Sequence, residues 1–314
     1  MRRITLGTPL TTEDLLAVAR GESVKLVFGR EAQSRVKSAR ALVEKMVKAG
    51  KPVYGVNTGF GLLASEQIDA ADVGQLQKNL LMSHAVGCGD DLSATEKRLA
   101  LLLRLQSMCQ GVSGVRPAVV KWFMQLFHSG WLPRVPEKGS VGACGDLAPL
   151  AHLALPVTGL GELVSPSGKM MSTKRGLKEI GLKPIELGAK EGLALINGVQ
   201  ISNAIGLGAW ASLRNLASTA DVAGALSVEA LMASHRPFDK RVTDVRPHAG
   251  ARWVSANLRR LLKGSEVAKF HKNCDRVQDP YSFRCMPQVH GAAHDVLGVL
   301  EGALLVEANA ATDN

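Results

Sequence analysis

The chain has 314 residues, of which 46% are hydrophobic and only 4% aromatic, and its net charge is +10 at neutral pH. This length accommodates one large domain or two smaller ones, and the apolar share is sufficient for a substantial core. Lys and Arg are spread along the chain among Asp and Glu, without a basic run that carries aromatic stacking partners. The composition therefore argues against a nucleic-acid-binding protein.

The sequence favours a cytoplasmic protein. The N-terminal residues lead straight into a polar segment without the apolar stretch of a secretory signal. No run of 18 apolar residues lacks Pro or charge, so we expect no membrane span. The cysteines form no CxxC pair and no metal-ligand spacing, and we expect reduced thiols. They are Cys88, Cys109, Cys144, Cys274 and Cys285.

Two helices and a strand are predicted at the start of the chain. Residues 11–14 read as a capping box that opens a helix ending at Gly21. Residues 23–28 alternate weakly and predict a short strand. Apolar residues then recur at helical spacing over residues 36–47, and Gly50 ends that helix.

Helical signals dominate the remainder of the chain. A capping box at Ser93 opens a helix over residues 93–111, and Pro117 suits the first position of another that ends at Gly130. Residues 162–171 predict a hairpin. After Asn197, a long run rich in Ala, Leu, Ser and Gly predicts one long buried helix or two in line. Residues 287–309 predict a second long helix, apolar on most faces.

These patterns predict a mainly α fold. We expect an N-terminal mixed α/β domain with short strands over residues 1–112, followed over residues 113–314 by part of a central bundle of long helices. A helix that is apolar on most faces needs neighbours on every side. Because the chain ends at Asn314, just after such a helix, we expect that more chain or other subunits cover it.

Three loop-like segments stand out, at residues 54–61, 139–146 and 273–284: the first two combine glycine with polar residues, and the third is rich in Asn, Asp, Gln and Arg. The only two tyrosines, Tyr54 and Tyr281, lie in the first and third of these segments, among Gly, Asn, Gln, Asp and Arg rather than on an apolar face. Polar loops on a helical scaffold are where chemistry is commonly placed. These segments are therefore the predicted functional site.

Cys144 lies in the middle segment, and the residues alone allow several interpretations. A nucleophile elbow fails because Asp146 stands where the second glycine is required. A cysteine nucleophile needs a neighbouring base, and His152 is about two helical turns away. A buried structural cysteine is the commonest fate of a lone cysteine.

Residues 139–152, Gly-Ser-Val-Gly-Ala-Cys-Gly-Asp-Leu-Ala-Pro-Leu-Ala-His, resemble the signature of the aromatic amino-acid lyases, with Cys144 where that family has serine. Residues 54–61 and 273–288 match the same family. The sequence of residues 271–285, together with the segment around His84, resembles the histidine enzymes more than those for phenylalanine or tyrosine. The chain thus resembles the histidine ammonia-lyase family over essentially its whole length.

The resemblance implies a methylidene-imidazolone cofactor made from Ala143, Cys144 and Gly145, without a metal or an external cofactor. The Gly145 nitrogen attacks the Ala143 carbonyl carbon and water leaves. The side chain of Cys144 then eliminates, as hydrogen sulfide instead of water. Glycine permits the tight bend that this step requires, and Asp146 assists the proton transfers.

The implied reaction is the non-oxidative conversion of L-histidine to urocanate and ammonia. By resemblance, Tyr54 takes the β-proton of the substrate and Tyr281 orients the cofactor or substrate. Arg284 binds the substrate carboxylate, for which a guanidinium is well suited. The remaining binding residues are Asn197 and Gln278, which bond to the imidazolone or the amine, and His84, which meets the imidazole ring.

Other interpretations stay open. His290 and His294 have the i, i+4 spacing of a metal pair, but no third ligand is evident and we expect no metal site. Family members are longer and are typically tetramers with shared sites. We therefore expect a homotetramer and, as a further partner, a C-terminal fragment of the same enzyme. The alternatives are a truncated, inactive lyase fragment or interaction subunit, and a phenylalanine or tyrosine ammonia-lyase or aminomutase.

Overall fold

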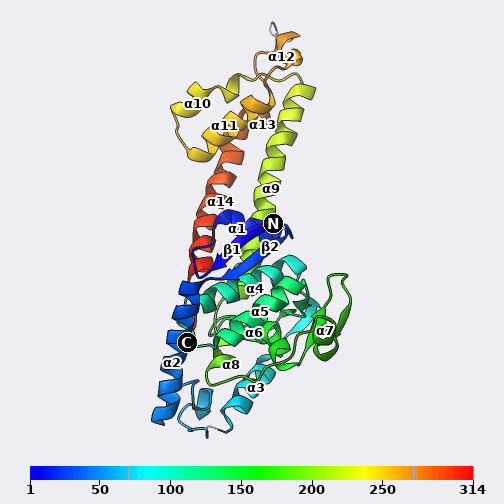
Figure 1. Ribbon diagram of the computed structural model, residues 1–314. Coiled ribbons are helices and arrows are strands. Elements are labelled where there is room, and N and C mark those ends of the chain that lie inside the picture. The colour runs from blue at the N-terminus through cyan, green and yellow to red at the C-terminus, as the bar shows by residue number, and fades with distance from the viewer. Residues whose placement is uncertain (70, 271–272, 274, 314) are drawn as a thin grey trace. The chain divides into compact units, whose positions relative to one another are not determined.

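The computed structural model describes residues 1–69, 71–270, 273 and 275–313 (Figure 1). These residues form two compact units: unit 1 comprises Met1–Gly208 with Leu304–Asn314, and unit 2 comprises Ala209–Ala303. The expected domain boundary at residue 112 does not separate these units. The expectations for Cys274, and for the neighbouring His271 and Lys272, lie outside the described residues.

The mainly α prediction is confirmed. The helices of unit 1 are α1 (Thr12–Ala19), α2 (Arg30–Ala49), α3 (Val73–His84), α4 (Ala94–Cys109), α5 (Pro117–Ser129), α6 (Leu147–Ala154), α7 (Thr173–Glu179) and α8 (Glu191–Ile196), with the 3-10 turns η1 (Gly61–Leu63) and η2 (Leu155–Thr158). The long helices α9 (Gln200–Ala230) and α14 (Met286–Asn309) have residues in both units. Unit 2 also holds η3 (Arg236–Phe238), α10 (Lys240–Asp244), α11 (Ala249–Leu261), α12 (Glu266–Phe270) and α13 (Tyr281–Arg284).

The helix ends follow local chemistry. Both predicted capping boxes form: the Thr11 side chain accepts the Asp14 N–H, and the Ser93 side chain accepts the Glu96 N–H. Each such cap stabilises its helix by about 1 kcal/mol. Pro117 opens α5 as predicted, and Gly130 ends it in the left-handed conformation that glycine adopts without strain.

The strands form small separate sheets in unit 1. β1 (Arg2–Leu6) pairs in parallel with β2 (Val24–Phe28), with α1 as the crossover (Figure 1). β3 (Cys88–Asp91) pairs antiparallel with β5 (Pro136–Lys138). β6 (Glu162–Val164) lies between β4 (Leu132–Pro133) and β7 (Met170–Ser172), so the predicted hairpin is confirmed. The β3–β5 pair leads directly into the segment that carries Cys144.

The core of unit 1 is built around α4, which is buried on nearly all its faces. Leu99 and Leu102 are fully buried there, against the helices α1 and α5. Phe123 and Phe127 of α5 belong to the same core. This burial is the main source of stability, and it makes a charged side chain in the middle of α4, such as Arg104, costly unless acceptors compensate for its lost hydration.

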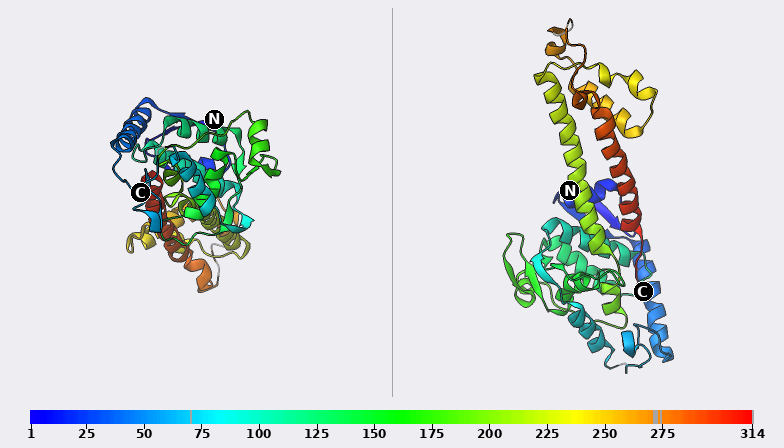
Figure 2. Two further views of the ribbon diagram at one scale, coloured as in Figure 1. Left: turned by 90° about the horizontal axis from the view of Figure 1, so that it is seen from below. Right: turned by 180° about the vertical axis from the view of Figure 1, so that it is seen from behind.

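Unit 2 has a smaller core, in which Val228, Phe238, Val254, Leu258 and Met286 pack together. The helices α9 and α14 run side by side (Figure 2), and the Trp210 indole N–H donates to the Leu297 carbonyl at 3.1 Å.

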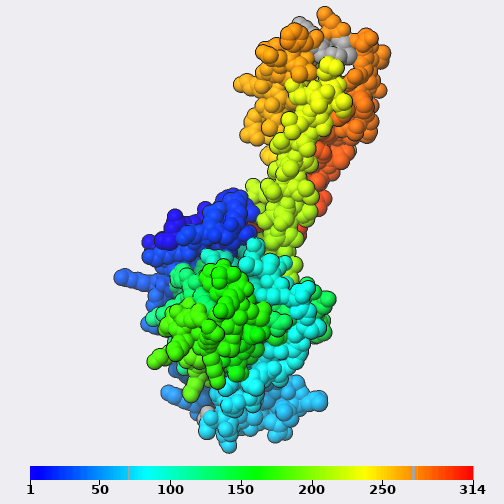
Figure 3. All heavy atoms as spheres, turned by 90° about the vertical axis from the view of Figure 1, so that its right-hand side faces the viewer, coloured from blue at the N-terminus to red at the C-terminus, as the bar shows by residue number. Residues whose placement is uncertain are grey.

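Much of the apolar surface of these two long helices is open in this chain. Leu216 and Leu226 of α9 are 63% and 66% exposed, and Val296 and Val299 of α14 are 67% and 77% exposed. Figure 3 shows α9, in yellow-green, at the surface of the face in view. Although the sequence analysis expected no membrane span, α14 is long and apolar enough to cross a membrane by length and composition alone. A helix that is packed between other helices has the same composition.

Candidate functional site

The backbone bends tightly at the segment Ala143–Gly145, between β5 and α6. Ala143 and Gly145 form a backbone bridge with each other across one intervening residue, and Gly145 forms a second bridge with Gly198. Cys144, at the tip of this bend, is an exposed free thiol. The interpretation as a buried structural cysteine is therefore wrong for this chain.

Two glycines allow the backbones of residues 145 and 198 to touch. Gly145 has φ +94°, and a Cβ at that position would collide with the Gly198 carbonyl. Gly198 has φ +144°, and a Cβ there would collide with the side-chain oxygen of Gln200. The Asp146 N–H donates to the Gly198 carbonyl at 2.7 Å. No other residue type fits this contact without a shift of the backbone.

Asp146 is 3% exposed, and its carboxylate joins two helix starts. It accepts the Ser202 N–H and the Ser202 hydroxyl, both at 2.7 Å, and the Ser140 hydroxyl at 3.3 Å. Ser202 lies in the first turn of α9, where the helix dipole favours an anion. Asp146 itself immediately precedes α6. The starts of α6 and α9 are thereby held together beside the bend.

Asn197 follows α8 and is partly buried, with its carbonyl bonded to the Arg104 guanidinium. The buried Glu191 anchors the start of α8 through a paired interaction with Arg116. The side-chain oxygen of Gln77, on α3, accepts the Gly192 N–H at 2.8 Å. These buried contacts hold α8 in place, so that Asn197 and Gly198, which follow it, lie beside the bend.

Tyr54 is 43% exposed, at a turn that rests on α8. Gly55 has φ +71°, and a Cβ there would collide with the side chain of Leu193. The Tyr54 ring packs edge-on against Phe60, with the ring centroids 6.0 Å apart. The side chain of Asn57 braces the turn by accepting the Val53 N–H at 2.8 Å. The backbone of Tyr54 is therefore fixed while its ring stays open to solvent.

His84 is the last residue of α3, with its Nδ1 atom 2.9 Å from the Leu80 carbonyl and 3.1 Å from the Ser83 hydroxyl. Because a carbonyl oxygen can only accept, we assign the ring proton to Nδ1. In that tautomer Nε2 is a hydrogen-bond acceptor, which suits recognition of a ring N–H.

His152 of α6 connects the His84 segment to the Cys144 segment. Its Nε2 atom accepts the N–H of Gly87 at 3.0 Å. Gly87 leads into β3, and the partner strand β5 leads into the bend at residues 143–145. The sequence analysis considered His152 only as a base for Cys144, and the structure instead makes it a brace between the two segments.

We predict that the protein loses stability as the pH falls below about 6.5, the unperturbed histidine pKa. Burial, with a smaller contribution from Arg134, lowers the pKa of His152. The unfolded chain therefore binds a proton at a higher pH than the folded chain does, and acidification through this window favours unfolding. Urea unfolding midpoints between pH 7.5 and 5.5 measure the effect. His152→Gln keeps a hydrogen-bond acceptor but cannot titrate, so the unfolding midpoint of this variant should fall less steeply with pH than that of the parent. An equal fall in both proteins would contradict the assignment of the effect to His152.

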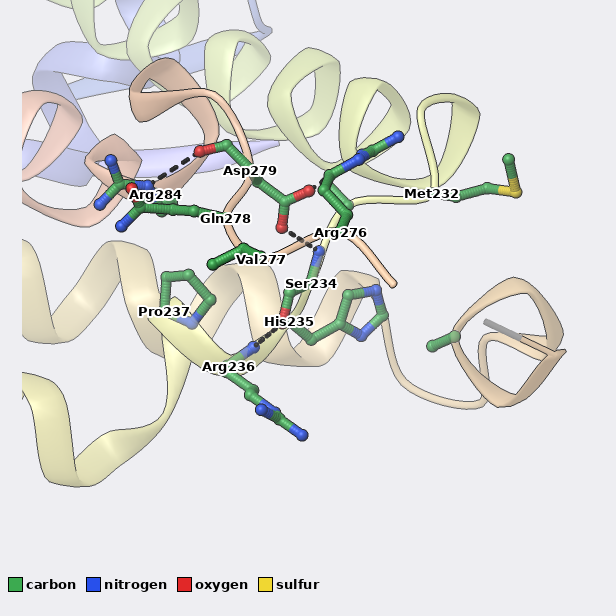
Figure 4. A pocket seen from close by; sticks show the side chains of 12 residues that line it. Met232, Ser234, His235, Arg236, Pro237, Arg276, Val277, Gln278, Asp279 and Arg284 are labelled. Atoms are coloured by element: carbon green, nitrogen blue, oxygen red, sulfur yellow. Dashed lines mark hydrogen bonds and ion pairs between the residues drawn. The ribbon is translucent and has the colours of Figure 1, made fainter. Parts of the chain in front are cut away.

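In unit 2, Gln278 and Arg284 line a pocket of about 570 Å³ (Figure 4). The Arg284 Nε–H donates to the Asp279 carbonyl at 3.0 Å, and its guanidinium lies 5.2 Å from the centre of the Tyr281 ring. The Asp279 carboxylate accepts the Ser234 N–H at 2.7 Å. The same pocket is lined further by Met232, Ala233, His235, Arg236, Pro237, Ala268, Arg276 and Val277.

The expected loop over residues 273–284 ends earlier than predicted. Tyr281 and Arg284 lie on the single turn of helix α13. Pro280 has an extended backbone and is the N-cap residue, a position where its missing N–H costs no helical hydrogen bond, so the helix begins after it. The Cys285 N–H closes the turn on the Tyr281 carbonyl. Both side chains thus project from a helical turn, and Gln278 precedes it in extended backbone.

His290 and His294 both face the buried carboxylate of Asp221. His290 Nδ1 lies 2.8 Å and His294 Nε2 lies 3.7 Å from its two oxygens. The Asn257 side chain donates to the same carboxylate at 3.0 Å. In the part of the chain that the structure describes, no group of three or more His, Cys, Asp or Glu side chains is placed to hold a metal ion.

Comparison with known proteins decides the family. The family model described as aromatic amino acid lyase matches residues 10–314. The chain belongs to the aromatic amino acid lyase family. The family resemblance carried by the residues around positions 54, 143 and 281 is therefore confirmed.

Among its relatives, this aromatic amino acid lyase is 47% identical to the histidine ammonia-lyase of Myxococcus xanthus (strain DK1622) over 308 residues, 98% of this chain and 60% of the relative. Its fold matches the crystal structure of histidine ammonia-lyase from Trypanosoma cruzi, with a TM-score of 0.88 at 39% identity, over 99% of this chain and 58% of that one. It also matches Pantoea agglomerans phenylalanine aminomutase, with a TM-score of 0.89 at 30% identity, over 100% of this chain and 63% of that one. The chain spans about 60% of the length of the curated relatives it matches.

The sequence analysis missed several residues around the bend in this lyase. Gly198 and Ser202 contact residues 145 and 146 across a long sequence separation, and no local pattern marks them. Arg104 carried a signal, because it is a charged residue inside the apolar helical run at residues 99–109. A cation in such a run needs buried acceptors.

Proposed function

We propose that this aromatic amino acid lyase removes ammonia from L-histidine without oxidation and yields urocanate. The observation that carries the proposal is the bend at Ala143–Gly145, held against Gly198. The 47% identity to proteins named histidine ammonia-lyase supports the choice of substrate.

The residues at the bend fit a methylidene-imidazolone made from the chain itself. Ring closure joins the Gly145 nitrogen to the Ala143 carbonyl carbon. The Ala143 oxygen leaves as water with the amide protons of Gly145 and Cys144. Elimination then removes the Cys144 sulfur and α-proton as hydrogen sulfide, without any oxidant or reductant. The absence of room for a Cβ at residue 145 and the exposure of the Cys144 thiol favour these steps.

When formed, the imidazolone supplies an electrophilic methylidene that makes the substrate amine a better leaving group. The chain's own residues hold the substrate and move its proton. The Tyr54 hydroxyl takes the β-proton, and His84 Nε2 accepts the imidazole N–H. Arg284 holds the carboxylate through a charge-assisted pair. Asn197, Gln278 and Tyr281 hydrogen-bond and orient the reacting groups, and Asp146 assists the proton transfers of ring formation.

The partners that we propose are further copies of this chain in a tetramer and the C-terminal part that the longer relatives have. The exposed apolar residues of α9 and α14, such as Leu216 and Val299, require cover of this kind. The proposed location is the cytoplasm.

A second candidate is turnover of phenylalanine or tyrosine, favoured by the likeness to Pantoea agglomerans phenylalanine aminomutase. His84 argues for an imidazole substrate instead, because its accepting Nε2 has no partner on a benzene ring. A third is an inactive fragment, since the chain spans about 60% of its relatives' length.

Intact mass and ultraviolet spectroscopy of the purified chain test the proposal. We expect a mass lower than the sequence mass by one water and one hydrogen sulfide, and urocanate formation from L-histidine but no cinnamate from L-phenylalanine. An unmodified mass with a free thiol at Cys144 would refute the cofactor. A modified mass without urocanate would favour the inactive fragment, and cinnamate formation would favour the second candidate.

A further inference from the structure

Arg104 is a buried cation in the core of unit 1. It lies on α4, is 1% exposed, and has fully buried leucines on either side in the sequence. Burial lowers the pKa of its guanidinium to about 10, against an opposing effect of the Asp313 charge. A charge at this depth is stable only where acceptors compensate for lost hydration.

The hydrogen bonds of Arg104 converge on one segment. Its Nη1 atom donates to the Asn197 carbonyl at 2.5 Å and to the side-chain oxygen of Gln200 at 2.9 Å. Within the described residues its Nε and Nη2 atoms have no hydrogen-bond partner. All the hydrogen bonds of the group thus hold residues 197–200, although two of its donor atoms stay unsatisfied.

That segment contacts Gly145, the residue whose nitrogen closes the proposed ring. The Gly198 carbonyl accepts the Asp146 N–H at 2.7 Å, and Gly198 forms a backbone bridge with Gly145. Because residue 145 has no room even for a Cβ beside the Gly198 backbone, a displacement of Gly198 would shift the Gly145 nitrogen relative to the Ala143 carbonyl carbon. Ring closure is sensitive to such displacements, since misplacement of reacting groups by about 1 Å can slow a reaction on the order of a hundredfold.

We propose that Arg104 is a positioning residue for ring closure: by holding the Asn197 carbonyl and Gln200, it fixes Gly198 against Gly145 and thereby the nitrogen that attacks Ala143. The inference rests on the proposed function, because it concerns the formation of the proposed cofactor. The step itself is the condensation already described, with loss of one water.

Arg98 provides a matched control on the same helix. It is an arginine of α4, partly buried, and burial lowers the pKa of its guanidinium. Its guanidinium lies 4.7 Å from the centre of the Phe127 ring, and none of its described contacts involves residues 197–200. Arg98→Gln therefore removes a partly buried cation from α4 without altering the support of Gly198.

The test follows the intact mass of newly made chain over time, for the parent, Arg104→Gln, Arg104→Lys and Arg98→Gln, with thermal unfolding of each. We expect ring closure in Arg104→Gln to slow on the order of tenfold or more, because the substitution removes the charged donor that bonds to both the Asn197 carbonyl and Gln200. Arg98→Gln should match the parent. Arg104→Lys keeps the charge on a single donor nitrogen, so its rate of ring closure should lie between the rates of Arg104→Gln and the parent.

The outcomes separate the inference from the proposed function. If the parent loses water and hydrogen sulfide but Arg104→Gln does so equally fast, the inference is wrong and the proposed function stands. Equal slowing by Arg98→Gln would show a general effect of stability and would also overturn it. If Arg104→Gln does not fold, parent-like ring closure in a folded Arg104→Lys refutes the inference and slowed closure supports it. If the parent itself does not close the ring, both the proposed function and the inference fail.

Discussion

Cys144→Ala is expected to abolish urocanate formation. Alanine has no group to eliminate from its β-carbon, so no methylidene can form even where the Gly145 nitrogen closes the ring. We expect the mass to fall by at most one water and turnover to drop on the order of 10⁴-fold or more, as for other covalent catalytic groups. Intact mass and the absorbance of urocanate measure both effects.

Cys144→Ser is the matched control, because it restores a leaving group of different chemistry. Hydrosulfide is a weaker base than hydroxide and therefore a better leaving group, but the family members that have serine here expel hydroxide. Cys144→Ser should therefore lose two waters and retain urocanate formation. Parent-like turnover in Cys144→Ala would mean that the reaction does not use this residue, and the proposed function would fall.

Local signals predicted the helix ends of this chain well. The capping boxes at Thr11 and Ser93, the first position of Pro117 and the glycine stop at Gly130 depend on neighbours within four residues. Such interactions are the same in any fold, because backbone donors at a helix start always need acceptors. They could therefore be identified without knowledge of the tertiary structure.

The pairing of strands and the packing of the site could not be predicted in this way. β3 (Cys88–Asp91) has the polar sequence Cys-Gly-Asp-Asp and becomes a strand only through its pairing with β5. The contact between Gly145 and Gly198 depends on how α8 and α6 pack, which no local pattern encodes. The family resemblance suggested the proposed roles of Tyr54 and Cys144, whereas the contacts of Arg104 and His152 became visible only in the packing.

Tyr54→Phe is expected to separate cofactor formation from catalysis. The change removes the hydroxyl that we assign to the β-proton but keeps the ring that packs edge-on against Phe60. Loss of a positioned acid or base lowers turnover by roughly 10²–10⁴-fold. Because the Tyr54 turn rests on Leu193 and makes no described contact with residues 143–145, the intact mass should still show loss of water and hydrogen sulfide.

Phe60→Leu is the control for this prediction, since it removes the ring contact and leaves the hydroxyl in place. We expect its turnover to stay within about tenfold of the parent, because the Tyr54 backbone is still braced by Asn57 and by the glycine contact with Leu193. If Tyr54→Phe turns over like the parent, another group takes the proton. If it fails to mature, Tyr54 acts in ring formation instead, and the assignment of the base has to move to the other tyrosine, Tyr281.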